Sequence, residues 1–137
     1  MEAFLALMSL VVDDYDEAIQ YFASVLDFRL TEDKDMGEGK RWVVMHPPGS
    51  SGCGLLLAKA KNDRQQSAVG NQSGGRVFLF LHTNDFAAVQ ERLSKYSVKI
   101  VRGPVTEAYG RVLVFEDLYG NLWDLIEPAK SGNADDL

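Results

Sequence analysis

Residues 116–128 read EDLYGNLWDLIEP, a tight turn followed by a strand of alternating character. The Gly-Asn step near the centre is a turn signal, and it separates two runs that are rich in apolar side chains. Over residues 121–127 successive side chains point to opposite faces of a sheet. We therefore expect Trp123 in a helix-covered core and Asp124 on the other face of the same sheet.

The remaining elements follow from hydrophobic periodicity. Apolar residues at three- and four-residue spacing predict a helix over residues 15–25, with Asp14 or Asp16 as its N-cap, and a second helix from Asp85 to about residue 96. Apolar runs bounded by turn residues predict strands over residues 4–12, 28–31, 41–46, 54–59, 76–82, 98–102, 111–116 and 121–127. The first strand is expected to be buried on both faces. Residues 32–39 are polar and are predicted to form a turn.

The order strand-helix-strand-strand-strand thus occurs twice, at a spacing of about 70 residues, with Gly39 aligned on Gly110. We predict an α+β fold of tandem βαβββ modules: residues 1–60 and 76–130, a linker loop over residues 61–75, and a flexible tail over residues 131–137. One helix covers one face of each four-stranded unit. We expect the two uncovered faces to form a curled mixed sheet around a cup, where a small molecule would bind.

The composition excludes several classes of function. The 137 residues carry 14 Lys and Arg against 20 Asp and Glu, a formal net charge of −6, which disfavours binding to nucleic acid or to an anionic membrane. The single cysteine, Cys53, rules out an internal disulfide and a cysteine-based zinc site. The first apolar run lacks the basic flank and the length of a secretory signal, so we expect a cytoplasmic protein.

Three stretches carry a resemblance to a known family: LVVDDYDEAIQYF at residues 10–22, the strand entry at residues 26–28, and EDLYGNLWDLIEP. Together they resemble the vicinal oxygen chelate (VOC) superfamily, which includes glyoxalase I, extradiol dioxygenases, fosfomycin-modifying enzymes and bleomycin-resistance proteins. The resemblance extends over residues 3–128 and implies the glyoxalase/bleomycin-resistance fold. It also implies a homodimer, in which the cup forms within one chain or between two.

The resemblance further implies that metal-dependent members take their ligands from the first and last strands of each half. Leu7 and Leu56 occupy these positions in the first half, and Arg76 and Asp124 occupy them in the second. Leucine cannot coordinate a metal, arginine repels one, and only Asp124 offers an oxygen donor. We therefore predict no metal cofactor at these degenerate positions.

A relocated metal site is the alternative, and it would recruit His46, His82 or Asp117. Both histidines lie at predicted strand ends beside turns, where an imidazole is usually half-solvated rather than bound to a metal.

We expect Arg76 and Asp124 to face each other and to form an ion pair in place of the metal, because a guanidinium matches a carboxylate in bidentate fashion. If this pair is open, Arg76 would instead hold a substrate carboxylate or phosphate. The alternative is an ordinary surface arginine at a strand end.

Apolar and aromatic side chains complete the expected cup. Alternation along the predicted strands selects Ser9, Phe78, Phe80, Trp42 (or Val43, depending on the register) and Tyr109 as ligand-binding candidates. Aromatic residues at strand spacing also serve simply as packing, which is the alternative for each of them.

These features favour a protein that binds a small organic ligand without the usual metal site, similar to bleomycin-resistance proteins. The second hypothesis is an enzyme, a metal-dependent glyoxalase-like lyase or dioxygenase with relocated ligands. A structural or regulatory partner domain is the third, and it explains the acidic surface but not the cup. The expected partners are a small-molecule ligand and a second copy of the chain, with neither nucleic acid nor a membrane.

Overall fold

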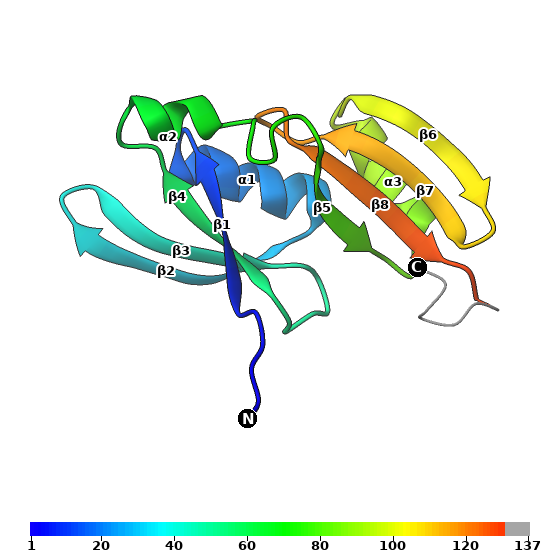
Figure 1. Ribbon diagram of the computed structural model, residues 1–137, viewed down its shortest axis with the longest axis horizontal. Helices are drawn as coiled ribbons and strands as arrows, with labels where there is room; N and C mark the ends of the chain where they lie inside the picture. The colour runs from blue at the N-terminus through cyan, green and yellow to red at the C-terminus, as the bar shows by residue number, and fades with distance from the viewer. Residues whose placement is uncertain (131–137) are drawn as a thin grey trace. The chain divides into compact units, whose positions relative to one another are not determined.

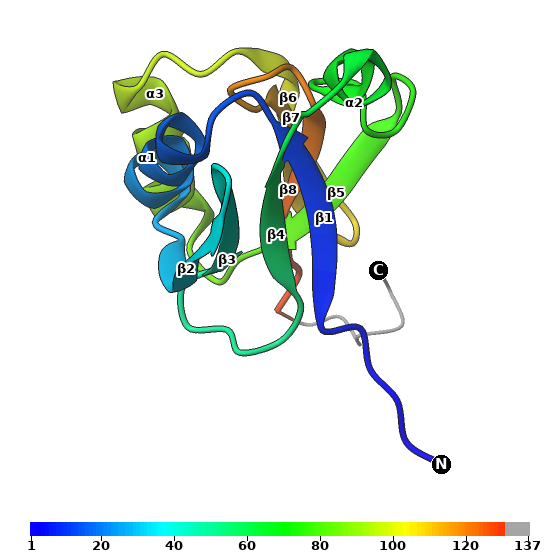
Figure 2. The ribbon, with the colours of Figure 1, turned by 90° about the vertical axis from the view of Figure 1, so that its left-hand side faces the viewer.

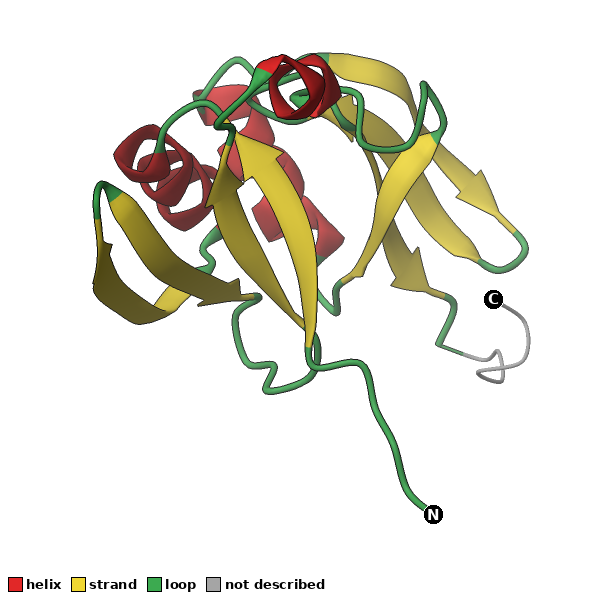
Figure 3. Cartoon of the chain, turned by 60° about the vertical axis from the view of Figure 1, so that its left-hand side comes forward, coloured by secondary structure: helices red, strands yellow, loops and turns green. Residues whose placement is uncertain are grey.

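The computed structural model describes residues 1–130, and the chain divides into two compact units, Met1–Gln72 and a second unit that begins at Ser73 (Figure 1). Each unit contains one mixed four-stranded sheet and one longer helix, as the colours in Figure 3 distinguish. The α+β class and the doubled βαβββ order are thereby confirmed. The tail predicted over residues 131–137 lies outside the described residues.

The N-terminal unit is built around a sheet in the order β1-β4-β3-β2. Its elements are β1 (Leu7–Val12), α1 (Tyr15–Leu26), β2 (Arg29–Gly37), β3 (Lys40–His46), β4 (Gly54–Lys59) and α2 (Asp63–Ala68). Strand β1 is parallel to β4, and the other pairs are antiparallel. Figure 2 shows α1 along one side of this sheet.

Asp14 is the N-cap of helix α1, and its carboxylate accepts a hydrogen bond from the Glu17 amide at 2.9 Å. The cap satisfies one of the free amides of the first helical turn. Phe22 on the apolar stripe of α1 is fully buried, as are Val43 and Leu57 on the strands. The core of this unit therefore lies between α1 and one face of the sheet.

The C-terminal unit repeats this plan with the strand order β5-β8-β7-β6. Its elements are β5 (Val77–His82), α3 (Phe86–Lys95), β6 (Ile100–Glu107), β7 (Gly110–Glu116) and β8 (Leu122–Pro128). Phe115 and Trp123 stack with their ring centroids 5.9 Å apart. Trp123 is only 2% exposed, as expected from the alternation along its strand. Glu127 joins sheet and helix, because its carboxylate accepts the Phe86 amide at 3.0 Å.

The register of the two hairpins corrects the alignment of the repeat. Strands β2 and β3 close at the pair Gly37 and Lys40, and β6 and β7 close at the pair Glu107 and Gly110. Lys40, and not Gly39, is therefore the counterpart of Gly110, one residue later than the sequence pattern indicates.

The first strand is shorter and less buried than predicted. Strand β1 begins at Leu7, and Phe4 and Leu5 before it are 89% and 79% exposed. Within the strand only alternate residues, Leu10 and Val12, are fully buried. The apolar run is therefore covered on one face of the sheet and not on both.

The segment expected to be a linker loop contains helix α2, which lies against the end of β1. The Gln66 side chain donates to the Asp13 carboxylate, and the side-chain Oε1 of Gln72 accepts a hydrogen bond from the Val11 amide at 3.4 Å. The segment has few apolar residues because polar contacts, and not burial, hold it in place. The two units separate after Gln72, within this segment.

Strands β2 and β6 are longer than predicted. Both are edge strands, and all of their residues are exposed. An edge strand buries neither face fully, so its sequence shows no alternation. Most of the turn predicted over residues 32–39 is therefore strand, and β6 continues through a Gly-Pro step to Glu107.

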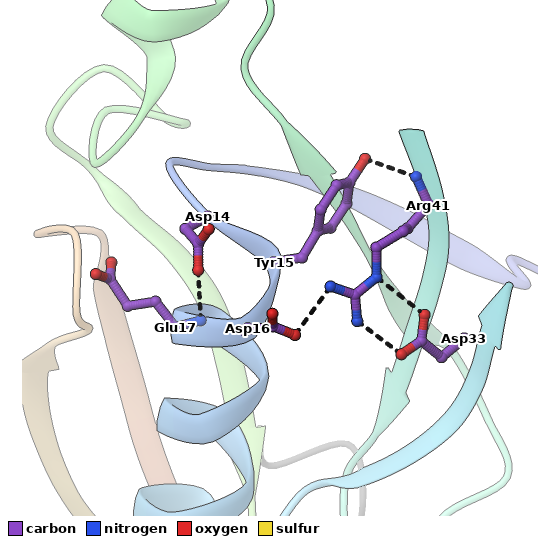
Figure 4. Close-up of polar contacts among 6 residues, drawn as sticks. All are labelled: Asp14, Tyr15, Asp16, Glu17, Asp33 and Arg41. Carbon is purple, nitrogen blue, oxygen red and sulfur yellow. Dashed lines mark hydrogen bonds and ion pairs between the residues drawn. The ribbon is translucent and has the colours of Figure 1, made fainter. Parts of the chain in front are cut away.

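Arg41 ties α1 to the hairpin of β2 and β3 (Figure 4). Its guanidinium donates to Asp33 at 2.7 and 3.2 Å and to Asp16 at 2.9 Å, and it lies 5.2 Å from the centre of the Tyr15 ring. The hydrogen bond from Arg41 holds the pKa of Asp33 below its ordinary value. Each of the three guanidinium nitrogens donates to a carboxylate of the protein, so this cluster serves the fold.

No helix within residues 1–130 combines the length and the apolar character that crossing a membrane requires.

We predict that Gly110→Ala destabilises the C-terminal unit by about 2 kcal/mol or more. Gly110 has φ of 152°, and a Cβ there would overlap the backbone carbonyl of Glu127 on β8. Urea unfolding followed by circular dichroism measures the loss. Gly52→Ala is the control, because its new Cβ would meet only the Ser50 hydroxyl oxygen at 3.5 Å. Equal effects of the two substitutions would show that the close approach of β7 and β8 is unimportant.

Candidate functional site

A row of four residues crosses the C-terminal sheet on the face opposite α3, which we call the open face. Phe80 on β5 is in register with Asp124 on β8, Asp124 with Val114 on β7, and Val114 with Arg102 on β6. Residues in register on neighbouring strands share a face of the sheet. Phe80 is 63% exposed, so this face carries an accessible aromatic ring beside a carboxylate.

A hollow of about 260 Å³ lies over part of this row. It is lined by Arg102, Gly103, Val105, Glu107, Tyr109, Val112, Leu113, Val114 and Asp124. Its wall therefore combines aliphatic side chains with a phenol and three charged groups.

Asp124 is the chemically unusual member of the hollow. Its Oδ1 atom is buried and has no hydrogen-bond partner among the residues that the structure describes. Burial raises the pKa of the Asp124 carboxyl, and the positive charges of Arg102 and His82 oppose this effect. A buried acceptor without a donor is costly to the folded state, so a ligand that supplies a donor would find a ready partner here.

The ion pair predicted between Arg76 and Asp124 does not form. Arg76 is exposed in the turn before β5, where its backbone carbonyl accepts from the Ser73 hydroxyl. Phe80 is the residue in register with Asp124, so Arg76 lies four residues further back, about 13 Å along the strand. The prediction was wrong because it placed the register of β5 too early in the sequence.

The same register corrects the list of degenerate metal positions. Ser9 is in register with Leu56 on β4, as Phe80 is with Asp124 on β8. Leu7 is in register with Gly54, two residues before Leu56, and Val77 is in register with Leu122, two residues before Asp124. Leu7 therefore corresponds to Val77, and not to Arg76. Phe78 is half-buried and falls within the register shift between β5 and β8.

The N-terminal sheet carries the equivalent row on its face opposite α1. Ser9, Leu56, Val44 and Glu32 are in register across β1, β4, β3 and β2. Trp42, two residues before Val44, shares this face, and its indole donates to Glu32 at 3.4 Å.

Of the two alternatives given by the sequence, Trp42 and not Val43 is therefore the residue on the face opposite α1. Val43 is fully buried on the side of α1, in register with Leu57.

Tyr109 lies in the turn between β6 and β7 and lines the same hollow as Asp124.

The residues present do not fit the metal site of metal-dependent relatives. Three of the four positions hold Leu7, Leu56 and Val77, and only Asp124 offers an oxygen. Within residues 1–130 no group of three or more His, Cys, Asp or Glu side chains gathers closely enough to hold a metal ion.

The residues considered for a relocated site have other contacts. The Nδ1 atom of His46 lies 2.9 Å from the Thr31 hydroxyl, and His82 is exposed at the end of β5. Asp117 is 6% exposed, and both of its carboxylate oxygens accept hydrogen bonds from the protein.

Asp117 organises the turn formed by the EDLYGN motif at residues 116–121. Its Oδ1 accepts the amides of Tyr119, Gly120 and Asn121 at 3.0 to 3.1 Å. Its Oδ2 accepts the Asn121 side chain at 3.1 Å and the Trp123 indole at 2.9 Å. A carboxylate with five donors has no lone pair free for a metal. The EDLYGN motif is therefore a structural turn that delivers β8 to the centre of the sheet.

Sequence reasoning missed most of the hollow. Val105 and Glu107 lie on β6 beyond a Gly-Pro step, which is ordinarily a strand breaker, and Arg102 directly precedes this step at the end of the strand predicted over residues 98–102. A register shift between Arg102 and Val105 accommodates the step and lets the strand continue. The first hairpin has a shift between Leu30 and Glu32 that matches the one between Ile100 and Arg102, but it has no Gly-Pro step that would have indicated the second shift.

Comparisons with known proteins agree with this architecture. The family model described as Glyoxalase/Bleomycin resistance protein/Dioxygenase superfamily matches residues 4–125. A protein of Shewanella frigidimarina, described only as uncharacterized, is 52% identical over 128 residues, which cover 93% of this chain and 95% of that protein.

Solved structures extend the comparison. The crystal structure of UcmS2 is similar with a TM-score of 0.79 and 26% identity, covering 93% of this chain and 99% of that one. TnmS3, described as an antibiotic binding protein from Streptomyces sp. CB03234, is similar with a TM-score of 0.73 and 26% identity, covering 93% and 98%.

We predict that Asp117→Ala destabilises the C-terminal unit by about 3 kcal/mol, because buried donors lose their acceptor. The control is Glu116→Ala, which removes a partly exposed ion pair with Lys99 at 3.3 Å and should cost less than about 1 kcal/mol. Urea unfolding followed by Trp fluorescence compares them. A small loss for Asp117→Ala would mean that the turn does not depend on its carboxylate.

We predict that Asp124→Asn raises the melting temperature at pH 7 by about 2–4 °C. The folded pKa of Asp124 lies above its ordinary 3.8, so the folded state holds its proton more tightly than the unfolded state. Stability is therefore lost as pH rises from about 3.8 through the raised pKa, and Asn removes this loss. The difference from wild type should vanish near pH 3.5, which melting curves at several pH values measure.

Asp33→Asn is the control of opposite sign. The folded pKa of Asp33 lies below 3.8, so its charge stabilises the fold above that pH, and the stabilisation is lost as pH falls through the lowered pKa. This variant should melt lower than wild type at pH 7. If both variants shifted the melting temperature in the same direction, the assignment of burial as the cause at Asp124 would be wrong.

Proposed function

Because the chain belongs to the glyoxalase/bleomycin resistance protein/dioxygenase superfamily, we propose that it binds a small organic ligand on the open face of its C-terminal sheet. We propose further that it does so without the divalent metal of metal-dependent relatives. The observation that carries the proposal is the hollow around Asp124, where a buried carboxylate oxygen has no partner.

The lining has the character of a small-molecule site. Such sites are mostly apolar and contain a few polar groups that orient the ligand. Here Val105, Val112 and Val114 supply aliphatic surface, and Tyr109 supplies an aromatic ring that is 40% exposed. Phe80 borders the same row on β5 and adds a second accessible ring.

The donor set supports binding over metal-assisted chemistry. A site that polarises two substrate oxygens needs several protein ligands and open coordination positions on the metal. One carboxylate, that of Asp124, among Leu7, Leu56 and Val77 does not supply such a set. The similarity to TnmS3, described as an antibiotic binding protein, supports the same choice.

We predict that Tyr109→Ala weakens binding of aromatic ligands by about 3- to 10-fold, because it removes a ring from the hollow. A thermal-shift screen of small aromatic compounds would identify a ligand, since a compound that binds the native state raises the melting temperature. Calorimetry then gives the dissociation constants. Tyr96→Ala is the matched control, because Tyr96 is similarly exposed, at 44%, but lies at the end of α3 outside the hollow.

Two results would contradict the proposal. One is equal weakening by both tyrosine substitutions. The other is near-stoichiometric nickel, zinc, manganese or iron in protein purified without a His tag, lost on substitution of Asp124.

A further inference from the structure

Two opposite charges on the open face share a row without forming a pair. Arg102 and Asp124 are both in register with Val114, one on each side, so their Cα atoms lie about 10 Å apart. Within residues 1–130, Asp124 Oδ1 has no hydrogen-bond partner, and the guanidinium of Arg102 makes no hydrogen bond or ion pair. Both side chains line the hollow, with the short Val114 between them.

The chemistry of the two groups restricts what can bridge them. A guanidinium only donates hydrogen bonds, and an ionised carboxylate only accepts them. A bridging group must therefore accept on the side of Arg102 and donate on the side of Asp124. A carboxylate ligand would be repelled by Asp124, and an ammonium ligand would be repelled by Arg102.

Resting on the proposed function, we infer that this hollow selects ligands whose polar part is an uncharged carboxamide. The amide carbonyl faces Arg102, the amide N–H faces Asp124, and the apolar part lies on the valines and Tyr109. A carboxamide is planar and carries its acceptor and its donors on opposite edges, which matches the order of the row.

The other charged groups nearby do not remove this requirement. Glu107 lines the hollow but is paired with Gly110, four residues along β7 from Val114, or about 13 Å from the row. His82 is two residues from Phe80 at the exposed end of β5. Neither side chain is a member of the row that holds Arg102, Val114 and Asp124.

The N-terminal sheet provides an internal comparison. Its equivalent row holds Leu56 in place of Asp124 and Glu32 in place of Arg102. Glu32 accepts from the indole of Trp42. The arrangement of a donor opposite an acceptor is thus a property of the C-terminal row and does not follow from the repeated fold.

Three probes with one ring test the inference: benzamide, benzoate and benzylamine. Titration of the isotope-labelled full chain, followed by amide chemical shifts of residues around the hollow, gives a dissociation constant for each. Benzamide should bind about 3- to 10-fold more tightly than either charged probe, because only benzamide satisfies both groups without repulsion.

Substitutions should reverse this preference in opposite directions. Asp124→Leu, which places the residue of the N-terminal row at this position, should make benzoate the preferred probe. Asp124→Asn, which keeps the shape, should also strengthen benzoate binding and guards against a folding defect. Arg102→Leu should make benzylamine preferred. Lys99→Leu, an exposed cation outside the hollow, should leave the ranking unchanged.

The outcomes separate the two proposals. A charged probe that outranks benzamide on the wild-type chain overturns the inference and leaves ligand binding at the hollow intact. A ranking unaffected by the Asp124 and Arg102 substitutions overturns it as well. If none of the three probes shifts resonances around the hollow, the proposed function itself is contradicted.

Discussion

The structure depends on one constraint: each four-stranded sheet has one longer helix, and a helix covers only one face of a sheet. In the C-terminal unit α3 caps the side of Trp123 and Leu125, and the alternation along β8 then places Asp124 on the opposite side. Asp124 therefore lies on the face that no helix covers, where no helical group can donate a hydrogen bond to its carboxylate. The open face and its hollow follow from this imbalance.

The Asp117 turn makes the arrangement possible. By accepting donors from the turn and from Trp123, it sets where β8 begins and which of its residues face α3. Asp117 and Asp124 are both acidic and only seven residues apart, yet their environments differ. One carboxylate is saturated by donors and is structural, whereas the other lacks a partner at Oδ1 and is available to a ligand.

The two halves keep the same backbone plan but carry different chemistry on equivalent rows. The N-terminal row holds Ser9, Leu56, Val44 and Glu32, and the C-terminal row holds Phe80, Asp124, Val114 and Arg102. Only the central valine is shared. Because of this divergence we propose the ligand site on the C-terminal sheet, while the homodimer implied by the family resemblance stays a prediction.

The sequence by itself determined the fold class, the doubled βαβββ order and the core position of Trp123, because periodicity is a local property. It could not determine which residue of β5 lies beside Asp124, since a register error of a few residues leaves the apolar pattern of that strand almost unchanged. It also could not find β6 beyond its Gly-Pro step, because an edge strand has no buried face to mark it. Only the tertiary structure placed Phe80 and Arg102 in the row with Asp124, because cross-strand pairing depends on backbone hydrogen bonds between distant segments.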